Sequence, residues 1–467
     1  MNPTSSIQGS FRDPSGAVYD LEGRIFRTVN PAGVEKYEAV RATGFLIRMV
    51  EQGRVVGLTE VNDPEILKQF PDAVYVLEHP RIDYISYPYE WCFYQLKKAA
   101  LHHLDLALDA LAAGLTMSDA TAYNIQYIGL NPTFIDHLSF GPYTDGSLWL
   151  AHNQFCEQFL NPLLLSSECG ILFNDWYRGR LEGVGTEDIA KLLPHRARLS
   201  LRMNAHVFLP AMFGKGSQKD AVARGRKTAK PTLSRAGYEG LLHQLKGWIS
   251  GLTPKGIKST VWADYADANT YDDAERNAKR SLIQDFATRI QPDRLIDLGC
   301  NSGDFSQAAL EAGAKSAIGY DFDHGALTAA CQRAEAEDIA FLPLFLDAAN
   351  PSPAQGWSQK ERSGFSNRAQ AESVLALAFI HHLAIGKNVP LDRAVRWIVE
   401  RAKTGLIEFV PKSDPTVQAM LDYREDIFTN YTIEEFRSHL SSMAIIEKET
   451  VVSSSNRVIF EYRIGEE

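Results

Sequence analysis

The chain has 467 residues and a formal net charge of −10, from 48 Lys and Arg against 58 Asp and Glu. This length exceeds what one hydrophobic core usually serves, so we expect two domains, with three as the alternative. Hydrophobic residues make up 45% and aromatic residues 10%, which excludes collagen-like, mucin-like and wholly disordered chains. The longest apolar runs, such as 374–380, fall short of the about 20 residues that a bilayer helix needs, so we expect no membrane partner.

The five cysteines are scattered, and none belongs to a CxxC pair or a paired histidine spacing. They are Cys92, Cys156, Cys169, Cys300 and Cys331. This pattern favours free thiols, no structural zinc and a cytoplasmic location. Residues 1–10 are polar, unlike the start of a secretory signal peptide. The acidic balance disfavours nucleic acid as the main partner, because proteins that bind phosphate backbones usually present a basic face.

Residues 1–214 are predicted to form an α+β domain. Its expected elements are a hairpin over 10–29 that turns at 13–16, a helix over 34–51, strands over 54–58 and 73–77, and an amphipathic helix over 96–113. A small sheet followed by helices differs from the pattern of the second half. We therefore expect the two halves to have different roles.

A basic segment, Lys215–Arg235, is the clearest change in composition, with seven Lys or Arg against one Asp and no apolar periodicity. Such a charge run is usually a solvated linker, and the alternative is an arm that binds phosphate or nucleic acid. We predict a basic linker and connecting helix over 215–259, which separates the first domain from a second domain over 260–467.

Strands and helices alternate through the second domain. Helices are expected over 277–290, 305–312, 325–335, 391–403 and 432–440, and strands over 294–298, 316–320, 341–346, 374–379, 405–410, 444–452 and 457–463. The helix at 432–440 begins with the capping pattern Thr432-Ile-Glu-Glu435. This alternation predicts a mostly parallel seven-stranded sheet with helices on both faces and a terminal antiparallel hairpin.

A tight turn follows the first strand of this domain, in the run Asp297-Leu-Gly-Cys-Asn-Ser-Gly303. Gly299 and Gly303 let the backbone approach a ligand closely, and the helix that follows aims its free amides at the same place. Asn301 suits the middle of the turn because Asn tolerates a left-handed backbone better than other non-glycine residues. In a doubly wound sheet the ligand lies at this crevice.

Further carboxylates follow the next two strands. Asp321 ends the second strand, where it can accept hydrogen bonds from a ribose diol, and Asp347 ends the third, where it can bind an exocyclic amine. Together with Asp297 they fit one nucleotide-binding half of a doubly wound fold. The alternative is that these acids only cap helices.

These residues resemble the first motif, D/E-x-G-x-G-x-G, of class I, Rossmann-like S-adenosylmethionine-dependent methyltransferases, and depart from it only at Asn301. The resemblance covers about residue 260 to the end. It implies a bound S-adenosylmethionine, with the cofactor-binding residues Asp297, Gly299, Cys300, Asn301, Gly303, Asp321, Phe322, Asp347 and Ala348. Among them, the glycines would face the methionine part, Asp321 the ribose and the Asp347-Ala348 pair the adenine. A dinucleotide dehydrogenase is disfavoured, because the expected G-x-G-x-x-G is absent.

The segment after the fourth strand of this domain carries His381 and His382. In methyltransferases of this type that segment faces the donor methyl group, so either histidine is a candidate base for an acceptor hydroxyl, amine or activated carbon. The alternative is that the two imidazoles only orient the loop. Glu408 and Lys412 are secondary candidates for substrate contact, and no metal is expected in this domain.

The first half contains a second spacing of interest. Asp119 and Asn124 are five residues apart, and Asp136 lies twelve residues further on, after a long amphipathic helix. This resembles the catalytic loop and metal-binding Asp of protein-kinase-like and aminoglycoside-phosphotransferase folds, in which an Asp positions the acceptor hydroxyl and an Asn and a second Asp hold Mg²⁺ on the nucleotide. The resemblance implies ATP and Mg²⁺ at these three residues.

Several features depart from that family. Ser118 precedes Asp119 where an H-x-D or H-G-D arrangement is usual, and neither a Gly-rich phosphate loop nor a V-A-I-K-like lysine is present. Arg27 is a candidate substitute for that lysine, with Glu35 or Glu38 as its ion-pair partner. The alternative is an α+β substrate-binding or dimerisation domain.

These observations together predict a two-domain methyltransferase that acts on a small-molecule or glycan acceptor. The methylated atom, O, N or C, stays open. One alternative is a bifunctional kinase-methyltransferase, and another is a non-catalytic protein that binds S-adenosylmethionine or a nucleotide. The overall layout resembles nodulation-type methyltransferases and the bifunctional kinase-methyltransferases of polysaccharide capping.

Overall fold

The computed structural model describes residues 6–212, 232–256, 273–422 and 424–465. The described residues form two compact units. The first unit comprises those up to Gly256 together with Gln355–Arg362, and the second comprises those from Asp273 onward without that segment. Most of the basic segment, 215–231, lies outside the described residues. No helix within the described ranges is long and apolar enough to cross a membrane.

The second unit is built on a seven-stranded sheet. Its strands are β9 (Leu295–Leu298), β10 (Ala317–Asp321), β11 (Phe341–Phe345), β12 (Ala371–Ala376), β13 (Ala402–Phe409), β14 (Ile445–Val451) and β15 (Val458–Arg463). Their order is β11-β10-β9-β12-β13-β15-β14, parallel from β11 to β13, with β15 antiparallel to both of its neighbours. The prediction of a mostly parallel sheet with a terminal hairpin is confirmed. The order reverses between β9 and β12, which is where such sheets bind ligands.

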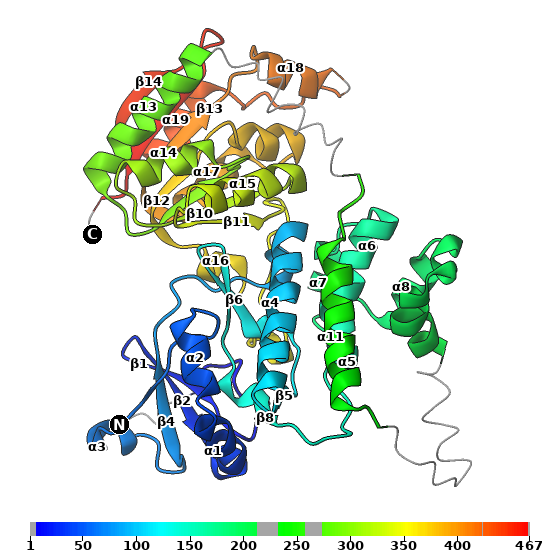
Figure 1. Cartoon of the computed structure of the whole chain (residues 1–467). Helices are drawn as coiled ribbons and strands as arrows, with labels where there is room; N and C mark the ends of the chain where they lie inside the picture. Colours follow the sequence, from blue (N-terminus) through cyan, green and yellow to red (C-terminus); the bar gives the residue numbers. More distant parts are fainter. Residues whose placement is uncertain (1–5, 213–231, 257–272, 423, 466–467) are drawn as a thin grey trace. The chain divides into compact units, whose positions relative to one another are not determined.

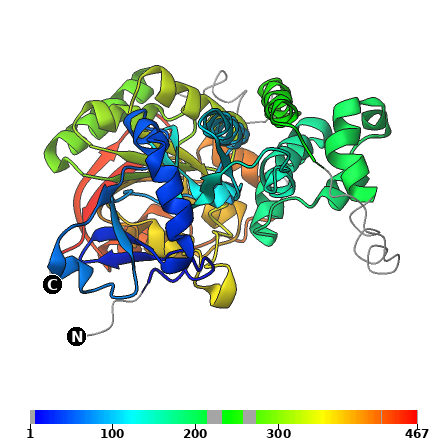
Figure 2. The ribbon, with the colours of Figure 1, turned by 60° about the horizontal axis from the view of Figure 1, so that its bottom comes forward.

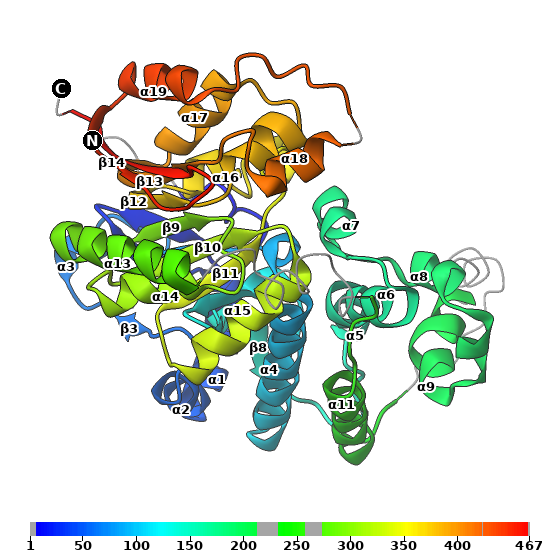
Figure 3. The same ribbon diagram turned by 90° about the horizontal axis from the view of Figure 1, so that it is seen from above.

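Helices cover both faces of this sheet. They are α13 (Asp273–Ile290), α14 (Asp304–Glu311), α15 (His324–Ala336), α16 (Phe365–Arg368), α17 (Leu391–Val399), α18 (Pro415–Leu421) and α19 (Ile433–Ser441). Figure 3 shows α13, α14 and α15 on one face, with α17 and α19 on the other. The predicted cap of α19 is present, because the Thr432 hydroxyl accepts a hydrogen bond from the Glu435 amide at 3.2 Å.

The first unit begins with a four-stranded antiparallel sheet of order β1-β2-β4-β3 (Figure 1). Its strands are β1 (Val18–Leu21), β2 (Arg24–Val29), β3 (Thr59–Glu60) and β4 (Tyr75–His79), and helices α1 (Val34–Ala42), α2 (Phe45–Glu51) and α3 (Pro64–Leu67) lie between them in the chain. The predicted turn at 13–16 was wrong, since the hairpin turns at Glu22 and Gly23, both with positive φ. The predicted helix over 34–51 is broken at Gly44, whose φ of 66° ends α1.

The rest of this unit is mainly helical. It contains α4 (Phe93–Ala112), α5 (His152–Phe155), α6 (Asn161–Cys169), α7 (Asn174–Gly179), α8 (Thr186–Leu192), α9 (Leu201–Met203) and α11 (Arg235–Ser250), with two short ladders formed by β5 (Leu115–Met117) with β8 (Phe140–Pro142) and β6 (Ile125–Ile128) with β7 (Asn131–Phe134). Helix α11 runs alongside α4, and Figure 2 shows both nearly end-on. Arg235 fixes this pairing by donating to the carbonyl of Leu111 at 2.7 Å.

Gln355–Arg362 joins the first unit although it lies between β11 and β12 in the chain. Glu361 forms an ion pair with Arg12 at 2.6 Å, and Gln355 donates to the carbonyl of Arg178 at 2.7 Å. The guanidinium of Arg362 lies 4.4 Å from the ring centre of Tyr123. The first unit is therefore assembled from two separate stretches of the chain.

Candidate active site

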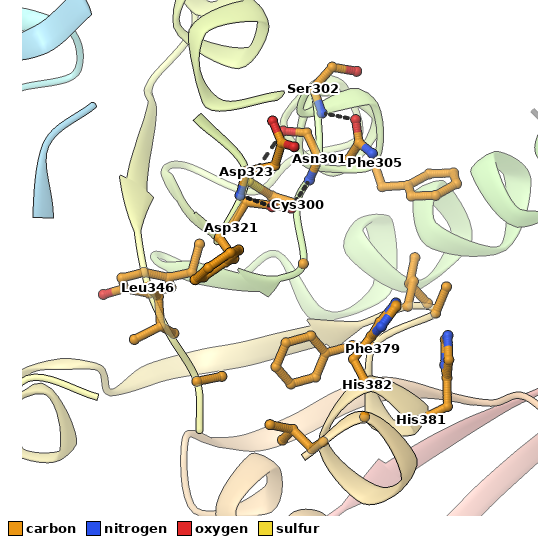
Figure 4. Close-up of a pocket in the computed structure, with 18 of the residues that line it drawn as sticks. Cys300, Asn301, Ser302, Phe305, Asp321, Asp323, Leu346, Phe379, His381 and His382 are labelled. Atoms are coloured by element: carbon orange, nitrogen blue, oxygen red, sulfur yellow. Dashed lines mark hydrogen bonds between the residues drawn. The ribbon is translucent and has the colours of Figure 1, made fainter. Parts of the chain in front are cut away.

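A cavity of about 560 Å³ lies at the carboxyl ends of the parallel strands of the second unit (Figure 4). Its wall is formed by the turn after β9, the ends of β10 and β11, and the loop after β12. This volume is in the range of a cofactor with part of a substrate. Nearly all the residues predicted to bind S-adenosylmethionine line it, namely Gly299, Cys300, Asn301, Asp321, Phe322, Asp347 and Ala348.

The turn after β9 depends on backbone conformations that few residues adopt. Gly299, Asn301 and Gly303 have φ values of 79°, 47° and 81°. A Cβ on Gly303 would lie 2.4 Å from Cε1 of Phe341, and one on Gly299 would lie 3.1 Å from Cδ2 of Phe379. Only glycine fits these two positions, whereas Asn301 stabilises its left-handed backbone by accepting a hydrogen bond from the Ser302 amide at 2.6 Å.

Asp321 connects this turn to the end of β10. Its two carboxylate oxygens accept hydrogen bonds from the amides of Asn301 and Asp323, both at 2.8 Å (Figure 4). Burial raises its pKa, and the two amides oppose this shift. The carboxylate is therefore fixed in place at the cavity wall with lone pairs left for a ligand diol.

Asp297 lies behind the turn rather than in the cavity wall. It is 2% exposed and accepts a hydrogen bond from the Ser306 hydroxyl at 2.6 Å. Burial, with a smaller contribution from Asp321, raises the pKa of Asp297 to about 7. A cation bound nearby would favour the charged form of this carboxyl group.

Asp347, Ala348 and Phe322 form the side of the cavity next to β11. Asp347 accepts a hydrogen bond from the Ala349 amide at 3.1 Å, which fixes the bend after the strand. Phe322 is 58% exposed, and its ring centre lies 5.7 Å from that of Phe345. An exposed aromatic face beside a fixed carboxylate suits a flat heterocycle with an exocyclic amine.

His381 and His382 lie across the cavity from the turn, next to Phe379 (Figure 4). Their ring centres are 4.1 Å apart. Burial lowers the pKa of His382 to about 4 and that of His381 well below its usual value. Both imidazoles are therefore neutral at pH 7. His381 is 1% exposed, and among the described residues neither of its ring nitrogens has a hydrogen-bond partner.

Glu408, at the end of β13, is fully buried and supports this wall of the cavity. One carboxylate oxygen accepts from Lys279 at 2.6 Å, and the other accepts from the Ala378 amide at 2.9 Å. Ala378 has a φ of 47°, so the carboxylate holds the loop that carries the histidines in a strained conformation. The secondary candidate Lys412 forms an ion pair with Asp426 at 2.8 Å and is not part of the cavity lining.

Sequence reasoning missed several lining residues. Arg276 and Lys279 come from α13, Lys387 from the loop before α17, and Arg457 from the turn between β14 and β15. Arg457 binds the Asp414 carboxylate at 2.6 Å and lies 3.8 Å from Glu408. No local pattern distinguishes these residues from surface cations, because only the folded sheet brings them to the cavity.

The first unit brings Asp119, Asn124 and Asp136 together. The Asn124 amide donates to both carboxylates, at 3.2 Å to Asp119 and 3.4 Å to Asp136. Each Asp also caps the turn that follows it, by accepting from the backbone amides of Thr121 and Leu138 respectively. The three residues named from the spacing thus lie together, and both carboxylates also cap turns.

The predicted partner of Arg27 was wrong. Arg27 pairs with Asp136 at 2.6 Å and approaches Asp13 at 3.6 Å, whereas Glu38 accepts from the Tyr75 hydroxyl at 2.5 Å. Arg27 is only 8% exposed, and a buried guanidinium needs a counter-charge that is itself sheltered. Asp136 meets this need.

Comparison with known proteins finds a relative that matches nearly the whole chain. Nodulation protein NoeA of Rhizobium meliloti (strain 1021) is 46% identical over 462 residues, which are 98% of this chain and 96% of that protein. The family model for ribosomal protein L11 methyltransferase (PrmA) matches residues 282–350. Ribosomal protein L11 methyltransferase of Histophilus somni (strain 2336) is 45% identical over 62 residues, which are 13% of this chain and 21% of that protein.

Solved structures described as methyltransferases also align with part of the chain. The N-methyltransferase NodS from Bradyrhizobium japonicum WM9 aligns with 42% of this chain and 99% of its own, at 12% identity and a TM-score of 0.31.

The turn itself can be tested at Asn301. Replacement by Val should lower the free energy of unfolding by about 1–2 kcal/mol, because a β-branched residue is strained at positive φ and the hydrogen bond to Ser302 is lost. Asn301→Gly, which removes the same hydrogen bond without strain, should cost less than Asn301→Val in urea unfolding. Equal losses in the two variants would show that backbone conformation does not limit this position.

Proposed function

The chain belongs to the same family as nodulation protein NoeA, and we propose that it methylates a small-molecule or glycan acceptor from S-adenosylmethionine. Its C-terminal half is a class I, Rossmann-like methyltransferase domain. The observation that carries the proposal is the cavity at the reversal of strand order, where a glycine-dependent turn and fixed carboxylates face the place where a cofactor would lie.

The residues of the cavity fit this cofactor. Gly299 and Gly303 allow a turn with positive φ that packs closely on Phe379 and Phe341, and Asp321 presents a fixed carboxylate to a ribose diol. The buried carboxyl of Asp297 and the carboxylate of Asp347 favour a ligand with a positive rather than a negative charge. S-adenosylmethionine supplies a methyl group on a sulfonium cation, from which it passes to the lone pair of an acceptor.

The protein's main contribution to catalysis would be alignment, because holding the acceptor in line with the methyl group removes much of the entropic barrier. For a hydroxyl or ammonium acceptor a proton must also leave. The neutral imidazoles of His381 and His382 line the cavity across from the turn and are candidates to take it. The cationic residues Lys387 and Arg457 on the same wall would contact the acceptor.

A second candidate function is nucleotide binding in the first unit. The observation that favours it is the convergence of Asp119, Asn124 and Asp136, the three residues that would hold ATP and Mg²⁺ in a kinase-like site. The ion pair between Arg27 and Asp136 would have to give way for Asp136 to bind the metal. If it does not, the cluster serves only to connect β5, β6 and β7.

Binding of S-adenosylmethionine should stabilise the wild-type protein by about 2.7 kcal/mol at 100 times the dissociation constant. Gly299→Asp should abolish this stabilisation, and Asp321→Ala should weaken it, whereas Asp293→Ala, at an exposed carboxylate of the same unit, should leave it unchanged. The measurement is ligand-dependent thermal unfolding. Absence of any effect of S-adenosylmethionine or S-adenosylhomocysteine on folded wild type would exclude the proposal.

The histidines can be tested by turnover. His381→Ala and His382→Ala should each lower kcat by at least about 100-fold if the imidazole acts as base, while His439→Ala on α19 should not. A base works only when deprotonated, so a pKa of about 4 for His382 predicts a kcat that is constant from pH 8 to pH 5 and falls towards pH 4. The readout is S-adenosylhomocysteine released with a panel of small-molecule and glycan acceptors. Full turnover in both variants would exclude a histidine base, and binding without turnover would favour a non-catalytic protein.

ATP with Mg²⁺ should raise the unfolding temperature if the second candidate is correct. Asp119→Asn and Asp136→Asn should remove this effect, whereas Asp145→Asn, at an exposed residue of the same unit, should keep it. Gly299→Asp should also keep it, which separates this site from the methyltransferase cavity. No effect of ATP and Mg²⁺ on wild type would assign the cluster a purely structural role.

A further inference from the structure

Three side chains with metal-ligating atoms meet in the first unit, apart from the residues discussed above. They are His152, Cys156 and His206, and their ligating atoms all lie within 4.8 Å of one another. Nε2 of His152 is 3.0 Å from Nδ1 of His206 and 3.6 Å from Sγ of Cys156. Cys156 and His206 are buried, and His152 is partly exposed.

Local helix geometry creates this meeting. His152 begins α5, and Cys156, four residues on, lies on the same side of the helix. Cys156 also begins a π-helical stretch, Cys156–Leu160, and His206 lies in a second one, Asn204–Phe208. Such stretches are rare and occur frequently at functional sites. Cys156 and His206 thus each lie in a π-helical stretch.

The distances fit a tetrahedral metal site. With zinc bound at about 2.0–2.1 Å to nitrogen and about 2.3 Å to sulfur, tetrahedral ligands lie about 3.3 Å apart when both are nitrogen and about 3.5 Å apart when one is sulfur. The observed separations of 3.0 and 3.6 Å are close to both values. The ligating atoms of Cys156 and His206 lie within 4.8 Å of each other, so an ion can enter when these two side chains close around it.

The surroundings orient the ligands and enclose them. Gln244 of α11 contacts Nε2 of His206 at 3.3 Å, so that Nδ1 points at the other two residues. The rings of Trp149 and Trp248 lie 5.8 and 5.9 Å from the rings of His152 and His206. Burial lowers the pKa of both histidines, which keeps their imidazoles neutral. The partly exposed His152 leaves a route from solvent.

We propose that His152, Cys156 and His206 bind a Zn²⁺ ion, which fixes α5 to the segment that carries His206. On binding, the Cys156 thiol becomes a thiolate and its proton passes to solvent, while the two neutral imidazoles donate their lone pairs. Three protein ligands leave a fourth position for water or another small ligand. The expectation of no structural zinc was based on the absence of CxxC and paired-histidine spacings. This set has neither spacing, because its third member, His206, lies far along the chain.

The test uses the full chain and two metal ions. Wild type dialysed against zinc should retain one ion per chain by elemental analysis, and Co²⁺ should give the thiolate-to-cobalt charge-transfer band of a Cys ligand together with the visible bands of tetrahedral cobalt. Cys156→Ser should remove the charge-transfer band, and His206→Gln should lower the affinity. Gln244→Leu, which leaves the ligands in place, should weaken binding by about 10–100-fold.

Matched controls lie in the same unit. Cys169→Ser and His195→Gln change residues outside the cluster and should leave stoichiometry and spectrum as in wild type. If wild type takes up neither zinc nor cobalt, the proposal is wrong and the three residues form a hydrogen-bonded core cluster. Equal loss of metal in Cys169→Ser and Cys156→Ser would equally overturn the assignment. If Cys156→Ser fails to fold, Gln244→Leu still tests the location, because it leaves the three ligands in place, and unchanged metal affinity in that variant would overturn the assignment.

Discussion

The buried carboxylate of Glu408 is the interaction on which the geometry of the cavity depends. It accepts from Lys279 on α13 and from the amide of Ala378 after β12, so one side chain joins three elements. Removing an ion pair of this kind from water costs free energy that only good geometry and further hydrogen bonds offset. Arg457, 3.8 Å away, brings the turn between β14 and β15 into the same network. The loop that carries the two histidines therefore keeps its conformation because Glu408, which holds it, is itself paired with buried cations.

The opposite wall has a different electrostatic character. Asp297 is buried behind the turn and Asp321 lies in the cavity wall, and burial raises the pKa of both carboxyl groups. A ligand with a sulfonium and an ammonium group beside these carboxyl groups would favour their charged forms. The acidic groups of this wall therefore support the proposal of a cationic cofactor.

Much of the second unit could be predicted from sequence because its information is local. Alternating apolar strands and helices predicted the parallel sheet. The run from Asp297 to Gly303 predicted a tight turn, and three of its residues do have positive φ. In the first unit local signals were weaker. The helix predicted over 34–51 is broken by Gly44, and the turn of the first hairpin lies at Glu22 and Gly23 rather than at 13–16. Both places are glycines with positive φ, Gly23 and Gly44, a backbone conformation that a pattern of apolar residues does not reveal.

Contacts between distant parts of the chain leave no local signal. Arg457 reaches the cavity only because β15 is inserted beside β13, and Gln355–Arg362 belongs to the first unit although strands of the second precede and follow it. The ion pair of Glu361 with Arg12 closes a loop of most of the chain, and such loops cost entropy before their contacts are made. A fragment that ends within the basic segment would leave Tyr123 and the Arg178 carbonyl without these partners. The first unit therefore receives its last segment, Gln355–Arg362, only after about half of the second unit has been synthesised.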